Sequence, residues 1–358
     1  MNANEIFSNS KKFSNTTQIK ELLNDDEIYV IDGYMIRTMS NRVDAEDPYK
    51  LSNDGKSLIR DNLKKIADAY KKIIYFESEE LAYNYESVSY FIEMCMEYDI
   101  KLFIYSFNCN INDFLKVKYP NQYLTKILAN TAATLIQNCN GLPPNLTRTK
   151  NKKLLFLNYN RKINRDLIIT YFKNWNELHN PENIISYHNN YTFNSNVYKT
   201  KYKDYAEKNG IDFNYLDSLV LKPEDVDVHN QGDAQQKAQL LHYESKFNII
   251  CEPFFGLSDD ISDYEYYNHT LSRKVVYPIL YNNVIFVHEH SPILSKTLKN
   301  LGFELFFDDI EDFKNNMTDE FYYSDETQRK LIHNNTLLKK LGSSYKKTLT
   351  DEINNFFN

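Results

Sequence analysis

The stretch from Phe247 to Val287 constrains the fold more than any other part of the chain. It opens with the apolar run Phe247–Cys251 and closes with the apolar run Val284–Val287. Between them, after a polar acidic loop, apolar side chains in residues 275–280 recur at the spacing of one buried helix face. Short, continuously apolar runs are typical of strands covered on both faces. The pattern therefore predicts strand, loop, helix and strand in a parallel sheet.

Polar residues flank the ends of these elements. Glu252 follows the first strand, where open α/β sheets place ligand-binding groups. Ser272 can cap the helix, and Arg273 and Lys274 fall in its first turn. Cations at that position oppose the helix dipole, so a bound anion would account for them. The alternative is two solvated charges on a surface helix.

A second strand-to-helix corner lies upstream. The apolar run Leu154–Leu157 predicts a buried strand, and residues 163–173 have the spacing of a helix. Asn160, Arg161 and Arg165 lie at the turn between them, where anions are commonly held. The two guanidinium groups could clamp a diphosphate, or they could face solvent.

In the first part of the chain, short apolar runs typical of strands alternate with segments that have helical spacing. Asp32 follows the first predicted strand and Glu77 follows the second, where an aspartate commonly forms a turn and a glutamate commonly caps a helix. The order of elements favours a Rossmann-like layer, and the absence of G-x-G-x-x-G argues against a dinucleotide cofactor. The predicted strands are 27–31, 72–76, 101–105 and, late in the chain, 303–307; the further predicted helices are 58–70, 86–97, 121–139, 294–301, 325–341 and 343–357.

A break in this pattern suggests a domain boundary. Gly141 to Pro144 interrupts the helical spacing, and a basic polar segment follows it. We expect an N-terminal domain over 1–148, a second domain over 149–340 and a C-terminal helix over 341–358.

The two corners carry a resemblance. Lys246 to Glu252, Ser272-Arg273-Lys274, Tyr277-Pro278-Ile279 and Val284 to Val287 resemble the donor-binding motif of α1,3-fucosyltransferase-like glycosyltransferases and related enzymes of tailed phages and giant viruses. That group often shows Phe-Leu-Asn-Tyr-Asn-Arg, which stands here at residues 156–161. The chain departs from the pattern at Arg273, where the family has a glutamate that touches the nucleotide ribose.

The resemblance implies an α/β fold of two Rossmann-like domains facing a cleft, the GT-B type, with the C-terminal helix crossing back onto the first domain. It implies a UDP- or GDP-sugar donor held by a metal-independent cradle, with a base from the first domain facing the acceptor. Glu252 would bind sugar hydroxyls or the ribose, or else only cap a turn. The residues assigned to the donor are Asn160, Arg161, Arg165, Glu252, Ser272, Arg273 and Lys274, and those assigned to catalysis are Asp32 and Glu77.

Composition narrows the partners and the compartment. The net charge of −7 argues against tight non-specific binding of nucleic acid. The four cysteines form no metal-ligand pattern, and no apolar run approaches the ~20 residues that span a bilayer. The N-terminal residues lack the apolar segment of a signal peptide. We expect a soluble cytoplasmic protein, in the host cytoplasm if viral, without a membrane partner.

The acceptor is either a hydroxymethylated base of phage DNA or a glycan. Duplex DNA would require a basic face, and the lysines that could supply it are Lys150, Lys152, Lys153, Lys199, Lys201 and Lys203. A non-catalytic binding protein that keeps the fold is a second hypothesis, motivated by Arg273. An α/β hydrolase or nuclease lacks a supporting cluster of carboxylates or a Ser-His-Asp pattern.

Overall fold

The computed structural model of this 358-residue chain carries no ligand. The residues that the structure describes are 27–32, 52–77, 85–106, 125–129, 150–157, 161, 163–188, 195–221, 239–251, 273–288 and 292–357. Contacts divide the chain into two compact units, of which the first takes in residues 1–134, 266–270 and 343–358 and the second takes in 135–265 and 271–342.

The first unit contains a parallel sheet whose strands follow the chain order β1-β2-β3-β4. Its strands are β1 (Ile28–Asp32), β2 (Lys72–Glu77), β3 (Lys101–Ser106) and β4 (Thr125–Ala129). The helix expected over 121–139 is wrong at its start, because residues 125–129 pair with β3. A short apolar run fits strand and helix equally well, so pairing along the edge of β3 decides it.

Helices cover both faces of this sheet. Ile31, Ile73 and Tyr75 pack with the apolar sides of α4 (Asn53–Ala67) and α5 (Tyr85–Glu97) on one face. On the other face Val30, Ile74 and Phe103 pack with Leu349, Ile353 and Phe357 from the end of α18. Alternate residues of β1, β2 and β3 thus supply the two cores, as expected for a sheet buried on both faces.

The C-terminal segment is one helix, α18 (Asp325–Phe357), and not the two helices that the sequence predicts. The predicted break fell at Gly342-Ser343, where glycine costs about 1 kcal/mol relative to alanine. Burial of Leu331 and Leu338 before the glycine and of Leu349 and Ile353 after it outweighs that local cost.

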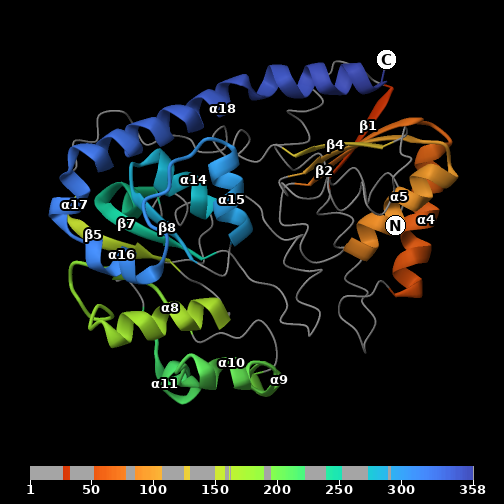
Figure 1. The fold of residues 1–358 in the computed structure, drawn as a ribbon. Helices are drawn as coiled ribbons and strands as arrows, with labels where there is room; N and C mark the ends of the chain where they lie inside the picture. Colours follow the sequence, from red (N-terminus) through yellow and green to blue (C-terminus); the bar gives the residue numbers. More distant parts are fainter. Residues whose placement is uncertain are drawn as a thin grey trace. The chain divides into compact units, whose positions relative to one another are not determined.

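The second unit contains a parallel sheet in the order β6-β5-β7-β8, which confirms the expected α/β fold with parallel sheets (Figure 1). Its strands are β5 (Lys152–Phe156), β6 (Ile184–Ile185), β7 (Ser245–Ile250) and β8 (Val284–Val287). All residues of β7 and β8 are buried, although β7 includes the polar residues Ser245, Lys246 and Asn248. The helices of this unit are α8 (Ile163–Asn174), α9 (Ser195–Lys201), α10 (Lys203–Lys208), α11 (Phe213–Ser218), α14 (Arg273–Leu280), α15 (Pro292–Asn300), α16 (Ile310–Asn316), α17 (Asp319–Tyr323) and the start of α18.

Helices α8 and α14 lie on opposite faces of this sheet (Figure 1). Phe156 and Phe247 face the core that contains Leu167 and Phe172 of α8. The neighbouring residue Asn248 points the other way, towards His242, whose ring lies 5.7 Å from that of Tyr277 in α14. Successive side chains of a strand point to opposite faces, so the two helices cover different sides.

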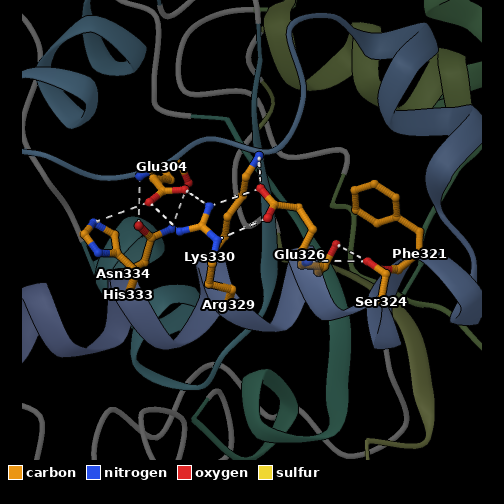
Figure 2. A network of polar contacts seen from close by, with 9 residues as sticks. Glu304, Phe321, Ser324, Glu326, Arg329, Lys330, His333 and Asn334 are labelled. Atoms are coloured by element: carbon orange, nitrogen blue, oxygen red, sulfur yellow. Dashed lines mark hydrogen bonds and ion pairs between the residues drawn. The ribbon is translucent and has the colours of Figure 1, made fainter.

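Residues 303–307 are not the strand that the sequence predicts. Asn334 of α18 replaces a strand partner there: it accepts from the Glu304 backbone N–H and donates to the Glu304 carbonyl, both at 2.8 Å (Figure 2). Arg329 then holds the Glu304 carboxylate with two hydrogen bonds of 3.0 and 2.6 Å and also reaches Glu326. The segment is pinned to a helix instead of to the sheet.

Candidate functional site

The second sheet changes direction between β5 and β7. From β5 the chain moves to β6 on one side, and it then returns past β5 to β7 and β8 on the other. Open α/β sheets bind ligands at such a reversal, in the crevice outside the carboxyl ends of the two strands. In the first sheet the described strands follow the chain order without a reversal. The binding position of this fold class therefore lies at the ends of β5 and β7.

Most of the predicted donor residues belong to the segments that meet at this edge. Strand β5 pairs with β7 in the register Leu155 to Asn248, so the carboxyl ends of the two strands are adjacent. Arg161 follows β5, and Arg165 lies in the first turn of α8. Arg273 and Lys274 are the first residues of α14, for which the structure describes the backbone. The expected residues outside the described part of the chain are Asn160, Glu252 and Ser272.

Arg161 is buried in an ion-pair network. Only 1% of the residue is exposed, so the alternative of a solvated Arg161 is wrong. Its Nε and Nη2 donate to Asp166 Oδ2 at 3.2 and 2.9 Å. The hydroxyls of Tyr187 and Tyr198 donate to the same carboxylate at 2.7 and 3.1 Å. Four donors on one buried carboxylate fix the guanidinium at the strand-to-helix corner.

The same contacts set the ionisation of the network. Burial raises the pKa of the Asp166 carboxyl, and the Arg161 guanidinium and the two tyrosine hydroxyls oppose that shift. Burial and the Asp166 charge raise the pKa of the Tyr198 hydroxyl, so it remains a donor. With its guanidinium partner and its hydroxyl donors in place, the Asp166 carboxylate has the contacts that a buried charge requires.

Asp217 completes the network from α11. Its Oδ1 accepts from Arg161 Nη1, and its Oδ2 accepts from Lys199 Nζ of α9. The side chains of Asp217 and Lys199 are 33% and 31% exposed, whereas those of Arg161 and Asp166 are fully buried. The buried arginine is thus linked to the surface through one carboxylate.

Sequence reasoning missed this network. Asp166 lies five residues after Arg161, so the sequence could have indicated this ion pair. An acidic residue in the first turn of a helix is more often explained by its favourable interaction with the helix dipole. Asp217 lies 56 residues from Arg161, and no local pattern could have joined them. Arg165 is also buried, at 6% exposure, so a solvated Arg165 is wrong as well.

Polar contacts hold α14 on its face of the sheet. Gln239 donates to the Tyr277 hydroxyl at 3.3 Å and accepts from the Tyr281 hydroxyl at 3.2 Å. Asn335 of α18 donates to the carbonyls of Ile279 and Leu280 at 3.2 and 2.7 Å, which satisfies the last turn of α14. These contacts fix the helix that begins with Arg273 and Lys274.

His242, under α14, should make stability depend on pH. Burial, and secondly the charge of Lys150, lower its pKa to about 3. In the unfolded chain the imidazole is protonated below about pH 6.5, whereas in the folded chain it stays neutral to much lower pH. The free energy of unfolding is therefore highest above about pH 6.5 and decreases as the pH is lowered. Between pH 6.5 and 5 the loss should be about 1.5–2 kcal/mol. Urea unfolding at both pH values should show it in the parent and in the exposed His179→Gln control. Persistence of the loss in His242→Gln would assign it to another group.

The candidate bases lie at the same edge of the first sheet. Asp32 ends β1 opposite Phe76 of β2, and Glu77 is the next residue of β2. The structure describes their backbones and brings the two positions next to each other at the carboxyl ends of neighbouring strands.

Most of the lysines expected to form a basic face have polar partners within the chain. Lys150 donates to the Ser245 carbonyl at 2.6 Å, and Lys152 donates to the Pro181 carbonyl at 3.0 Å. The others with a carboxylate partner are Lys153 with Glu177, Lys199 with Asp217 and Lys203 with Glu207. Each of these five lysines thus has an intramolecular polar partner, and the Nζ of Lys201 lies 5.6 Å from the centroid of the Tyr202 ring.

The described ranges contain neither a metal-binding cluster nor a membrane-spanning helix. There, no group of three or more His, Cys, Asp or Glu residues is placed to hold a metal ion. No helix among those residues combines the length and the apolar character needed to cross a membrane.

The class that this architecture defines is an α/β protein with a ligand position at the reversal of a parallel sheet. Its sequence matches no protein-family model and no curated protein. Among solved structures it is similar to an alpha-glucosyltransferase in complex with UDP-glucose and DNA containing an abasic site, with 12% identity and a TM-score of 0.46. The similarity covers 95% of this chain and 84% of that one.

Proposed function

We propose that the protein is a GT-B glycosyltransferase that moves a sugar from a UDP- or GDP-sugar to an acceptor. The observation that carries the proposal is the reversal between β5 and β7, since the segments bearing Arg165, Arg273 and Lys274 reach that edge of the sheet. The motif resemblance of the same two corners supports a nucleotide sugar over other anions.

The proposed chemistry follows from charge development. When the glycosidic bond to the diphosphate breaks, negative charge grows on the leaving phosphate, and preorganised cations stabilise it. Arg161, Arg165, Arg273 and Lys274 are proposed for that role, in place of a metal. Neighbouring Asn160 and Ser272 would bind the donor, and Glu252 would bind its hydroxyls.

We propose the first unit as the acceptor side, with Asp32 or Glu77 as general base. A hydroxymethylated base of DNA is the first acceptor to test, and a glycan is the alternative. Contacts of the lysines named above with DNA would compete with their intramolecular partners.

Transfer of radiolabelled glucose from UDP-glucose to hydroxymethylated DNA, unmodified DNA and a glycan panel tests the proposal. A thermal-shift screen of UDP-, GDP- and CMP-sugars accompanies it, since a ligand at about 100 times its Kd adds ~2.7 kcal/mol of stability. Stabilisation without transfer to any acceptor would favour the non-catalytic binding protein, which the departure at Arg273 motivates. If no nucleotide sugar stabilises the protein and no acceptor receives glucose, both functions are rejected.

The double variant Arg273→Gln/Lys274→Gln should separate affinity from stability. Loss of each cation should weaken UDP binding by about ten- to a hundredfold. Stability should rise slightly, by roughly 0.3–1 kcal/mol, because cations in a first turn oppose the helix dipole. Isothermal titration calorimetry and urea unfolding measure the two quantities, with the exposed Lys296→Gln as the matched control. An unchanged UDP affinity in the double variant would remove both residues from the cradle.

A further inference from the structure

We propose that Asp217 is an internal counter-anion that occupies Arg161 until a phosphate of the ligand replaces it, and that Lys199 then retains the displaced carboxylate. This inference rests on the proposed function. It assigns to Asp217 and Lys199 opposite effects on the affinity for a nucleoside diphosphate.

The two carboxylates on Arg161 occupy different environments. Asp166 is fully buried and also accepts from the hydroxyls of Tyr187 and Tyr198, so its contacts with Nε and Nη2 are permanent features of the core. Asp217 is 33% exposed and accepts from Nη1 of Arg161. Water and solutes can therefore reach the second carboxylate, while the first remains enclosed.

The charges of the network balance while Asp217 pairs with Arg161. The two cations, Arg161 and Lys199, face the two carboxylates, Asp166 and Asp217. If Asp217 turns away from Arg161, its Oδ2 contact with Lys199 keeps it paired, because its two oxygens serve different cations. Arg161 Nη1 can then donate to a phosphate oxygen without leaving a buried charge unpaired.

Aromatic rings keep the guanidinium in place during such an exchange. Its Cζ lies 5.7 Å from the centroid of the Tyr198 ring and 5.6 Å from that of Phe213, both within the range of cation–π attraction. With Asp166 still bound, Arg161 would not have to reorganise. The group that moves is the carboxylate of Asp217 on the short helix α11, which is one-third exposed.

Two variants with opposite expected effects test the exchange. Asp217→Asn removes the competing charge and should tighten binding of UDP and of inorganic pyrophosphate by roughly three- to tenfold. Lys199→Gln removes the residue that retains Asp217 and should weaken binding of both probes by a similar factor. Both variants lose an ion pair, so both should unfold at a slightly lower temperature. A merely structural role would move affinity in the same direction in both.

Isothermal titration of the full chain measures the affinities, with the exposed Lys208→Gln as a control expected to bind like the parent. Tighter binding by Asp217→Asn together with weaker binding by Lys199→Gln supports the exchange. If the parent binds UDP but Asp217→Asn binds it equally or more weakly, the exchange is wrong and the proposed function stands. If the parent binds neither UDP nor any nucleotide sugar, the proposed function fails and the exchange fails with it.

Discussion

Asp166→Ala should lower the free energy of unfolding by about 3–5 kcal/mol, because removing one partner of a buried pair leaves the other charge without compensation. Arg161 and Asp166 are both fully buried, and the hydroxyls of Tyr187 and Tyr198 lose their acceptor as well. The melting temperature should fall by roughly 6–20 °C for a unit of this size. Urea and thermal unfolding of the purified chain measure both quantities.

A double variant shows whether the loss comes from the unpaired charge. Arg161→Met/Asp166→Leu replaces the pair with apolar side chains, which is often neutral or stabilising, so it should recover most of the loss. The double variant should bind UDP more weakly than the parent, because it lacks Arg161. The exposed Asp204→Ala is the control and should change stability by no more than about 0.5 kcal/mol. A double variant less stable than Asp166→Ala would contradict this explanation.

Asp32→Asn should reduce kcat for sugar transfer by roughly 10²–10⁴-fold if Asp32 is the general base, with the donor affinity unchanged. The substitution keeps the size of the side chain and removes only its ability to take a proton. Glu77→Gln tests the second candidate, whose backbone lies at the same edge of the first sheet. Steady-state transfer assays with saturating donor measure kcat.

The control for both is Asp61→Asn, an exposed carboxylate on α4 in the same unit, which should turn over like the parent. A large loss in one of the two variants and not in the other would identify the base. Near-normal turnover in Asp32→Asn and in Glu77→Gln would remove both candidates and place the base elsewhere in the chain.

The strands and helices that the sequence predicts best are those whose pattern is local. Val284–Val287 is apolar throughout and Phe247–Cys251 is apolar except for Asn248, because β7 and β8 are buried, and such runs do not depend on distant residues. The errors occur where a distant partner decides: β3 recruits residues 125–129 into the sheet, and Asn334 takes the place of a strand for residues 303–307.

The candidate site divides in the same way. The positions of Arg161, Arg165, Arg273 and Lys274 at the starts of helices follow from local spacing, and the sequence predicts them. The environment of Arg161 does not follow, because Asp166 and Asp217 bind it from two helices, and Tyr198 of a third helix and Tyr187 after β6 bind Asp166. Neither an exposed clamp nor a solvated charge describes an arginine that is buried between two carboxylates.

We expect a nucleoside diphosphate to bind outside the carboxyl ends of β5 and β7. Crystals of the protein grown with UDP-glucose would give its position from difference electron density. The density for the diphosphate should lie at the reversal of the second sheet, within hydrogen-bond reach of Arg165, Arg273 or Lys274. Density for the nucleotide at the amino ends of those strands, or on the first sheet, would contradict it.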